Sequence, residues 1–381
     1  MDDRQFGPDS PGRLAPTILG ANAYIPNPLP PSIDLASVFA AHGDAMAGMG
    51  ALNAKIGQLK NPQLIIRPLQ RREALLSSAM EGTYSTSDEL ALLEAGAEAG
   101  ARADTREVLS YVNALMHSVD LMRSLPICHR MIREAHAILL AGLAQGRGGS
   151  KRPGEYKQDQ NWIGGRSLAE ARFVPPPPAE AAQLMDQLEA FMNRPVPHDM
   201  PALLEAAIVH YQFETIHPFA DGNGRVGRIL IPLVLLSRNL IATPVFYPSA
   251  SMESRKDEYI DRMFAVSTKG DWSGWLRFFL EICRDTCATS IDVIDRILTL
   301  QSDYRETAMR TFRSNNVLIL IDQLFSTPVI TTPSVQVLLG VTHRAARMTI
   351  ANLEQIGVLE KIEGPRMPEY FAAREILRVG G

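Results

Sequence analysis

Apolar residues recur at three- and four-residue intervals through most of this chain. That spacing places them on one face of an α-helix, and no alternating strand pattern competes with it in the first half. The sequence therefore predicts a mainly α fold. The helices expected from the spacing cover residues 33–56, 68–80, 88–97, 104–124, 126–143, 180–193, 200–215, 225–238, 254–268 and 272–301. The second of them is expected to start at Pro68, because proline is tolerated in a first helical turn.

Two stretches interrupt the helical pattern. The first, residues 1–32, is rich in proline, which blocks regular helix and predicts an extended segment that either wraps the core or is loose. The second, residues 146–178, is rich in Gly, Pro, Gln and Asn, with a short hairpin expected at residues 160–173. A long irregular stretch inside a compact domain is usually functional, so the second is a candidate part of a site.

Composition narrows the class of protein. A chain of 381 residues with 46% hydrophobic residues is long and apolar enough for two or three folded domains, which excludes disorder as its main state. Its formal charge of −4 gives no overall attraction to nucleic acid or anionic membranes. The cysteines are too few for a disulfide framework and are expected to be buried and reduced. With no apolar run near the roughly 18 residues of a membrane span and no leader pattern, we expect a soluble cytoplasmic protein without membrane contact.

The last part of the chain has the pattern of a small separate module. Helices are expected at residues 317–324, 332–339 and 342–356, and residues 358–362 and 368–371 are expected to pair as a ribbon turning at Gly364 and Pro365. This order is typical of a winged helix-turn-helix. We therefore expect these domains: an extended segment at 1–32, a helical region at 33–110, a helical core at 111–300 that carries the candidate site described next, and the winged helix-turn-helix at 301–381.

The most informative window is His-Pro-Phe-Ala-Asp-Gly-Asn-Gly-Arg-Val-Gly-Arg at residues 217–228. Gly222 and Gly224 flank an asparagine, so successive backbone N–H groups can converge into an anion-binding turn, and the following helix adds its positive N-terminal end. Arg225 and Arg228 lie three residues apart on that helix, so both guanidinium groups can reach the same phosphates. The window predicts a phosphate site.

Two further side chains in the window suit chemistry on a phosphate. Asp221 offers a hard oxygen ligand for a Mg²⁺ that arrives with a polyphosphate. His217 is the one group in the window whose ordinary pKa suits proton abstraction near neutral pH. A Walker-type site is excluded because no Gly-Lys-Ser/Thr follows the turn. His210, two helical turns earlier, is expected to be a core histidine.

The window matches H-P-F-x-[D/E]-G-N-G-R-x-x-R at every fixed position, and so resembles the Fic (filamentation induced by cAMP) domain family. The resemblance implies a Fic-type helical bundle that transfers AMP from ATP to a protein hydroxyl, with His217 as the base and Mg²⁺ on Asp221. It also implies that Asn223 and the two glycine amides bind the α- and β-phosphates and that Arg228 binds the γ-phosphate. The ATP-binding residues expected in this window are Asp221, Gly222, Asn223, Gly224, Arg225, Val226, Gly227 and Arg228.

Residues 154–165 resemble the β-hairpin flap of the same family, which lies over the active site and aligns a target segment by β-addition. Lys157 stands where many relatives have Arg, so positive charge is kept and the planar fork is lost. The plain alternative is a surface hairpin. The residues of this segment expected near ATP are Asn161, Trp162, Ile163 and Gly164.

Residues 255–272 are similar to the family helix that lines the adenine pocket. There Tyr259 offers a face for the base, and Ser267 lies where a polar contact to adenine is expected. The alternative is that Tyr259, Met263 and Val266 form an ordinary core stripe of the helix.

Ser77-Ser78-Ala79-Met80-Glu81-Gly82 fits [S/T]-x-x-x-E-[G/N], the pattern of the family's inhibitory helix. The resemblance implies that Glu81 reaches the ATP site and pairs with Arg228. One guanidinium fork cannot bind a carboxylate and a γ-phosphate at once, so Glu81 would inhibit productive ATP binding.

The leading hypothesis is therefore an autoinhibited protein adenylyltransferase whose partners are ATP, an unidentified target protein and itself. Whether a homodimer controls the release of Glu81 stays open. One alternative is a nucleotide-sensing regulator that binds DNA through the winged helix. From residue 312 onward, however, the chain has seven basic and six acidic residues, so its net charge of +1 gives little attraction to DNA phosphates. The other is removal of AMP from a modified protein, in which Glu81 would orient a water; the intact Asp221 and arginines favour a nucleoside triphosphate instead.

Overall fold

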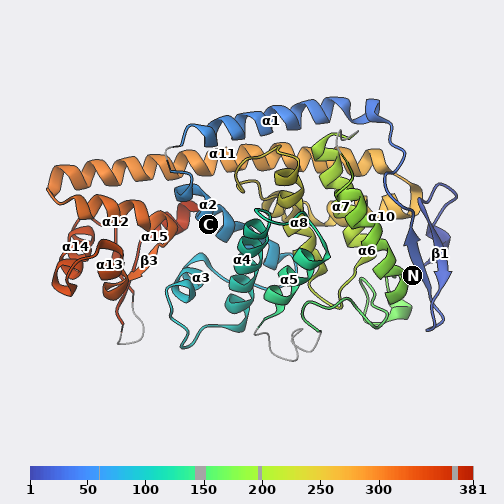
Figure 1. Cartoon of the computed structure of the whole chain (residues 1–381), viewed down its shortest axis with the longest axis horizontal. Helices are drawn as coiled ribbons and strands as arrows, with labels where there is room; N and C mark the ends of the chain where they lie inside the picture. The colour runs from blue at the N-terminus through green and yellow to red at the C-terminus, as the bar shows by residue number, and fades with distance from the viewer. Residues whose placement is uncertain (60, 142–151, 196–199, 363–367, 381) are drawn as a thin grey trace. The chain divides into compact units, whose positions relative to one another are not determined.

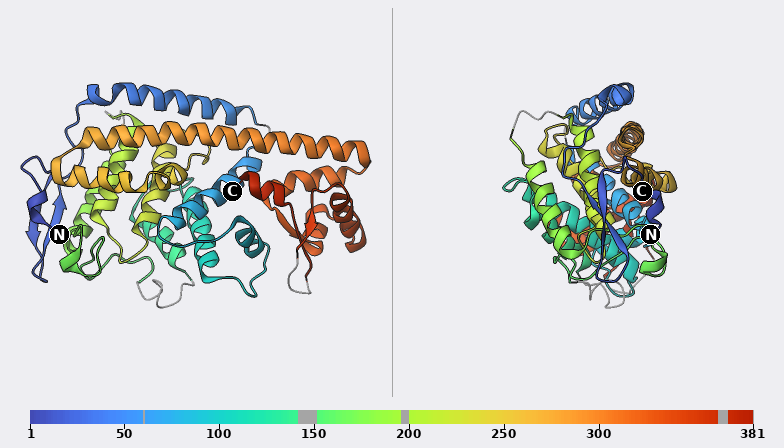
Figure 2. Two further views of the ribbon diagram at one scale, coloured as in Figure 1. Left: turned by 180° about the vertical axis from the view of Figure 1, so that it is seen from behind. Right: turned by 90° about the vertical axis from the view of Figure 1, so that its right-hand side faces the viewer.

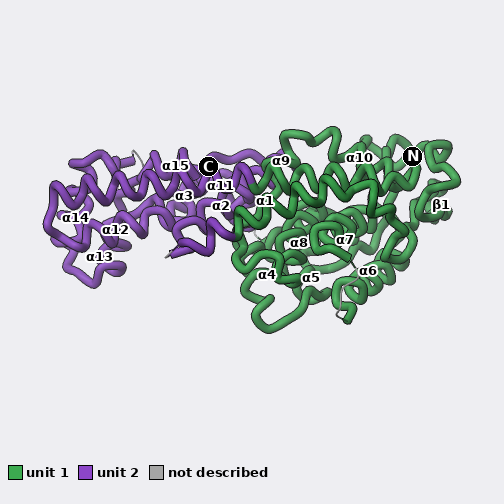
Figure 3. The backbone as a smooth tube through the Cα atoms, turned by 90° about the horizontal axis from the view of Figure 1, so that it is seen from above, with its two compact units in different colours: residues 1–53, 113–287 green, residues 54–112, 288–381 purple. Residues whose placement is uncertain are grey.

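Helices make up most of the chain, as the apolar spacing predicts. The computed structural model describes residues 1–59, 61–141, 152–195, 200–362 and 368–380. Figure 3 shows two compact units, with residues 1–53 and 113–287 in unit 1 and residues 54–112 and 288–381 in unit 2. The division falls within α1 (Phe39–Gly57), α4 (Ala103–Leu121) and α11 (Trp272–Thr311). Among the described residues, no helix combines the length and the apolar character that crossing a membrane needs.

Unit 1 is built around α7 (Ala202–Ile216) and α8 (Asn223–Ser237), which pack against each other (Figure 1). Every residue of α7 from Leu203 to Phe213 is buried, the pattern of a helix surrounded by core. The helices predicted for this part of the chain are confirmed, with ends shifted by a few residues. The other α-helices described in this unit are α5 (His129–Leu140), α6 (Pro178–Met192), α9 (Ser249–Glu253) and α10 (Lys256–Lys269), and short 3-10 helices cover Asp3–Gln5, Leu35–Val38 and Leu168–Glu170.

The proline-rich N-terminal segment forms a hairpin of β1 (Gly12–Pro16) and β2 (Asn22–Pro26), with Leu14 opposite Tyr24. It packs against the rest of unit 1, because Tyr24 is fully buried and its N–H donates to the Val174 carbonyl at 2.9 Å. The N–H of Gly7 donates to the carbonyl of Thr268 in α10 at 2.9 Å. Figure 1 and Figure 2 show the hairpin beside α10. The segment therefore wraps the core rather than lying loose.

Unit 2 joins the C-terminal residues to helices from the first third of the chain. In it, α2 (Gln63–Ala79) packs against α12 (Asn315–Ser326) and α15 (Arg374–Gly380). The other helices of the unit are α3 (Ser87–Glu94), α13 (Thr332–Leu339) and α14 (His343–Gln355). The start predicted for α2 at Pro68 is wrong, since the helix begins five residues earlier. Leu64 and Ile65 are buried there, and this packing stabilises a turn that precedes the proline.

A three-stranded antiparallel sheet completes unit 2, in the order β3 (Val329–Thr331), β5 (Tyr370–Ala372), β4 (Glu360–Lys361). The predicted ribbon is confirmed, because Lys361 pairs with Phe371. Its predicted turn at Gly364 and Pro365 lies outside the described residues. The sequence did not indicate β3, a strand of three buried residues that is too short to show an alternation.

Candidate active site

The turn between α7 and α8 has an unusual backbone. His217 ends α7 with φ 49°, in the left-handed region that residues other than glycine rarely adopt. Gly222, just before α8, has φ 74°, which glycine adopts without steric cost. These two left-handed residues bound the loop of residues 217–222, and α8 starts directly after it, so Gly224 and Arg225 lie in its first turn.

The imidazole of His217 has a defined orientation. Its Nδ1 lies 3.2 Å from the backbone carbonyl oxygen of Glu214. A carbonyl oxygen only accepts hydrogen bonds, so Nδ1 carries the proton in the neutral ring. The lone pair is then on Nε2, the nitrogen that can take a proton from another molecule.

Asn223 closes the loop on itself. Its Oδ1 accepts from the N–H of Phe219 at 2.8 Å, and its Nδ2 donates to the carbonyl of the same residue at 2.8 Å. Asn223 is 2% exposed, so its amide is committed to holding the loop in this structure. The N–H of Gly222 donates to Oδ1 of Asp221 at 2.6 Å, so one amide of the expected phosphate turn faces that carboxylate.

Asp221 is the candidate metal ligand. Its side chain is 44% exposed, and a guanidinium nitrogen of Arg225 lies 3.9 Å from Oδ1. The described residues contain no cluster of three or more His, Cys, Asp or Glu side chains suited to hold a metal. Mg²⁺ commonly binds through one or two carboxylates together with substrate phosphates, so a single accessible carboxylate beside the turn that is expected to bind phosphate fits this ion.

Arg225 and Arg228 are 3% and 2% exposed on the first two turns of α8. Buried guanidinium groups need partners, and both side chains interact within the protein. Val226 and Gly227 are also buried and pack α8 against α7: the Gly227 carbonyl lies 3.0 Å from Nδ1 of His210.

His136 on α5 supports the loop, and sequence reasoning missed it. Its Nδ1 accepts from the N–H of Gly154 at 2.9 Å, so its Nε2 carries the proton and donates to the Asp221 carbonyl at 3.1 Å. The ring stacks on Phe219, with centroids 3.8 Å apart. Burial lowers the pKa of His136 to about 4, so the ring is neutral near pH 7. Its signal in the sequence is a lone histidine on the apolar face of a helix.

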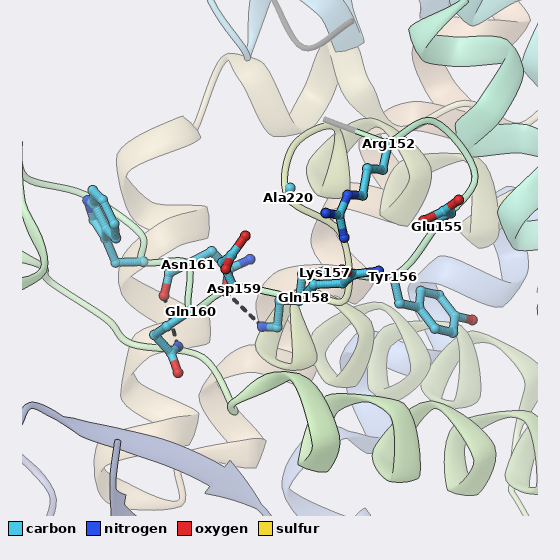
Figure 4. Close-up of a pocket in the computed structure, with 10 residues that line it drawn as sticks. Arg152, Glu155, Tyr156, Lys157, Gln158, Asp159, Gln160, Asn161 and Ala220 are labelled. Atoms are coloured by element: carbon cyan, nitrogen blue, oxygen red, sulfur yellow. Dashed lines mark hydrogen bonds between the residues drawn. The ribbon is translucent and has the colours of Figure 1, made fainter. Parts of the chain in front are cut away.

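The hairpin expected at residues 160–173 is confirmed by a single antiparallel bridge, in which Ile163 and Phe173 exchange backbone hydrogen bonds of 2.8 and 3.1 Å. Gly165, with φ 75°, turns the chain there, and a Cβ on it would lie 2.4 Å from the Glu170 carbonyl oxygen. Gly164 has φ 71° in the same turn. The residues before the bridge line a cavity of about 290 Å³, with Ala220 of the loop on its wall (Figure 4).

Asn161 and Trp162 both line this cavity but differ in their surroundings. The amide of Asn161 is hydrogen-bonded to Lys157 and to the backbone of the loop. Trp162 is 41% exposed. The structure thus brings the flap residues and the loop together in unit 1.

Tyr259 and Ser267, the expected adenine contacts, lie in the interior of unit 1. The hydroxyl of Tyr259 is 2.8 Å from Nε2 of His210, and the hydroxyl of Ser267 is 2.8 Å from that of Tyr211. Their exposures are 4% and 2%, which favours the core alternative for this helix. His210 is the core histidine that the sequence predicts, and burial lowers its pKa to about 3.

Glu81 follows the C-terminal end of α2, in unit 2, whereas the loop and α8 belong to unit 1. Its N–H donates to the Ser78 carbonyl at 3.0 Å, and Gly82, with φ 80°, ends the turn. Ser77 and Ser78 are fully buried, so the inhibitory pattern starts inside the core of its unit and ends at an exposed glutamate.

We expect Gly222→Ala to lower the free energy of unfolding by about 1–2 kcal/mol, because a Cβ is unfavourable in the left-handed region. The added carbon would also lie 3.2 Å from Cδ2 of Leu139. Urea titration of the full-length chain measures the difference. Gly43→Ala is the matched control: it lies within α1, where a Cβ meets nothing within 4 Å, and it is expected to keep or raise stability. An unfolding free energy for Gly222→Ala equal to that of the parent chain would contradict this account of the turn.

Two family models and several curated proteins match the sequence of this chain. The family model described as "Fic/DOC family" matches residues 126–235, and the one described as "Fic/DOC family N-terminal" matches residues 39–120. The chain is 26% identical over 223 residues to a protein adenylyltransferase Fic of Drosophila mojavensis, covering 58% of this chain and 38% of that relative. It is 27% identical over 178 residues to the protein of the same name from Drosophila grimshawi, covering 47% and 32%. The chain thus spans about a third of the length of these curated relatives.

Solved structures resemble the fold. A Fic family protein from Desulfovibrio desulfuricans G20 has a TM-score of 0.55 at 20% identity, over 91% of this chain and 98% of that one. Residues 134–508 of Fic-1 from C. elegans give a TM-score of 0.52 at 17% identity, over 68% and 74%.

Proposed function

This chain belongs to the Fic/DOC family, and on that premise we propose that it is a protein adenylyltransferase, which transfers AMP from ATP to a hydroxyl side chain of a target protein. The observation that carries the proposal is the His217 imidazole. Its Nδ1 is engaged by the Glu214 carbonyl, and it stands directly before a glycine-rich turn at the start of a helix. The names of the curated relatives support the same activity.

In the proposed reaction, Nε2 of His217 takes the proton of the target hydroxyl. The hydroxyl oxygen forms a bond to the α-phosphorus of ATP, the bond from that phosphorus to the bridging oxygen breaks, and pyrophosphate leaves with that electron pair. The histidine contributes basicity at one atom because its other ring nitrogen is fixed to the backbone. Stacking and hydrogen bonds of His136 keep the loop, and hence the base, in place.

The phosphates are proposed to bind at the amides of Gly222 and Gly224 and at the guanidinium groups of Arg225 and Arg228. Both arginines are buried and already interact within the protein, so a polyphosphate has to compete for them. Mg²⁺ is proposed to bind the Asp221 carboxylate, where it would neutralise phosphate charge. The remaining ligands would come from the nucleotide and water.

Competition for Arg228 is the basis of the autoinhibition that we propose. Glu81 would be the protein carboxylate that holds the Arg228 fork until the γ-phosphate displaces it. The motif of residues 77–82 supports this role, and so does the position of Glu81 at an exposed turn, where a local movement would release it.

The C-terminal elements are proposed to form a winged helix that binds protein rather than DNA. Their order of α12, β3, α13, α14, β4 and β5 is that of the module. On α14, which would be the recognition helix, Arg347 stacks over Phe371 at 4.7 Å and lies 3.6 Å from the Glu354 carboxylate. A guanidinium engaged in this way is a poor phosphate contact. Val337 and Met348, 84% and 63% exposed, add apolar surface to α13 and α14.

The proposed function predicts a metal-dependent labelling reaction. The full-length chain, incubated with Mg²⁺ and ATP labelled at the α-phosphate, is expected to incorporate the label into itself. EDTA in excess is expected to abolish incorporation, because without the cation the negative Asp221 carboxylate would face the negative phosphates directly. Electrophoresis with autoradiography measures both. Undiminished incorporation in EDTA would contradict the metal assignment.

A further inference from the structure

Four consecutive backbone carbonyls, those of residues 216–219, accept hydrogen bonds from two residues of the flap segment. The backbone N–H of Lys157 donates to the Pro218 carbonyl at 2.8 Å, and its Nζ lies 3.3 Å from the Ile216 carbonyl. Nδ2 of Asn161 donates to the carbonyls of His217 and Phe219 at 3.1 and 2.9 Å. The carbonyl side of the loop that carries the base is therefore tied to the flap.

Lys157 also determines which way the Asn161 amide faces. Its Nζ donates to Oδ1 of Asn161 at 2.7 Å (Figure 4). An ammonium group has donors and no acceptor, so Oδ1 is the amide atom that faces it. Nδ2 is then directed at the loop carbonyls, which only accept. Reversing the amide would place an N–H against the ammonium and an oxygen against two carbonyl oxygens.

The surroundings of Lys157 are energetically unfavourable for a charged side chain. The residue is 5% exposed, and its Nζ acceptors within the described residues are neutral oxygens. An ammonium buried without a carboxylate is destabilising. Burial lowers the pKa of Lys157 to about 7. We expect a buried charge of this kind to be kept where the charged group has a role that an apolar side chain of similar length cannot fill.

His217 needs such support because its backbone is left-handed, with φ 49°. A residue other than glycine keeps this conformation only where its surroundings enforce it. We propose that Lys157 is a positioning residue: it orients Asn161, and the two together hold the left-handed turn that presents the His217 imidazole to the reacting hydroxyl. That the turn presents His217 to a reacting hydroxyl rests on the proposed function, whereas the role of Lys157 and Asn161 in holding the turn does not.

Three variants of the full-length chain test the proposal, each made in the Glu81→Gly background, which is expected to raise the labelling rate. Lys157→Met removes the ammonium and keeps the apolar stem. Lys157→Arg keeps a positively charged donor. Asn161→Asp keeps an acceptor for Lys157 but removes both donors to the loop. The kcat and the KM for ATP of self-labelling are measured for each.

Lys157→Met and Asn161→Asp are expected to lower kcat by tenfold to a hundredfold, on the order expected for a misplaced reacting group, with KM for ATP unchanged. Lys157→Arg is expected to retain most of the parent rate. Hydrogen exchange of the peptide covering residues 216–222, followed by mass spectrometry, needs no activity, and is expected to be faster in the two defective variants than in the parent chain and in Lys157→Arg.

The outcomes separate this inference from the proposed function. If the Glu81→Gly chain, which is the parent of these variants, transfers no AMP, the proposed function fails and the hydrogen-exchange measurement alone decides the role of Lys157. Parent-like kcat and exchange in Lys157→Met would overturn the inference, and so would a raised KM for ATP with unchanged kcat, which would make Lys157 a nucleotide contact. If Lys157→Met does not fold, as judged by thermal melting, Asn161→Asp decides by the same criteria.

Discussion

Replacing His217 with alanine is expected to lower the rate of AMP transfer by about 10²- to 10⁴-fold, the usual contribution of a general base, while ATP still binds. Only Nε2 of this residue is proposed to act in the reaction, and the proposed phosphate contacts come from the glycine amides and arginines that follow it. Initial rates of self-labelling give the first quantity, and titration calorimetry with ATP gives the second.

A matched control is available at His117, a histidine on α4 that is 39% exposed and lies 2.8 Å from the Glu134 carboxylate. His117→Ala removes the same side chain far from the turn in sequence, and it is expected to leave the labelling rate unchanged. A His217→Ala chain that labels itself at the parent rate would contradict the assignment of the base.

The second large effect is expected from Glu81→Gly, which should raise the labelling rate. The substitution removes the carboxylate that is proposed to hold Arg228, and so frees that guanidinium for the γ-phosphate. A hydrogen bond to a charged group contributes about 1.5–3 kcal/mol. At about 1.4 kcal/mol per factor of ten, the gain should be tenfold or more. The initial rate at fixed ATP and Mg²⁺ measures it.

Arg228→Ala in the Glu81→Gly chain is expected to cancel the gain in labelling rate, because the γ-phosphate then has no guanidinium to bind at this position. Glu98→Gly serves as the control, since it makes the same change at another exposed glutamate of the same unit and should leave the rate as it is. Unchanged labelling in Glu81→Gly would overturn the inhibitory role. A lower rate would instead point to removal of AMP, which release of labelled AMP from a premodified chain measures.

Most of the helices could be predicted from sequence because they bury one apolar face, which gives apolar residues a three- and four-residue spacing; α7, which is buried on all sides, is the exception. The errors occur where distant contacts decide the structure. Burial of Leu64 and Ile65 extends α2 ahead of Pro68. The N-terminal hairpin lies in a proline-rich segment whose composition indicates only extended chain, and it is stabilised by contacts such as the hydrogen bond from the Tyr24 N–H to the Val174 carbonyl.

In the candidate site, too, the features that depend on neighbouring residues could be predicted from the sequence, and those that depend on distant contacts could not. The loop and the start of α8 are contiguous in sequence, so the residue types and order alone indicated a turn with a base and an anion site. The groups that hold the loop come from elsewhere: His136 lies on α5, and Lys157 and Asn161 lie in the flap segment. Their contacts are made by tertiary packing, which no local pattern encodes.

The proposed activity is tested most directly by following the two ends of the triphosphate in the full-length Glu81→Gly chain with Mg²⁺. In parallel reactions, ATP is labelled at the α-phosphate or at the γ-phosphate, and the protein is separated from small molecules. Adenylyl transfer predicts that the α label enters the protein and that the γ label is recovered in pyrophosphate. Entry of the γ label into the protein, or absence of the α label from it, would contradict the proposed reaction.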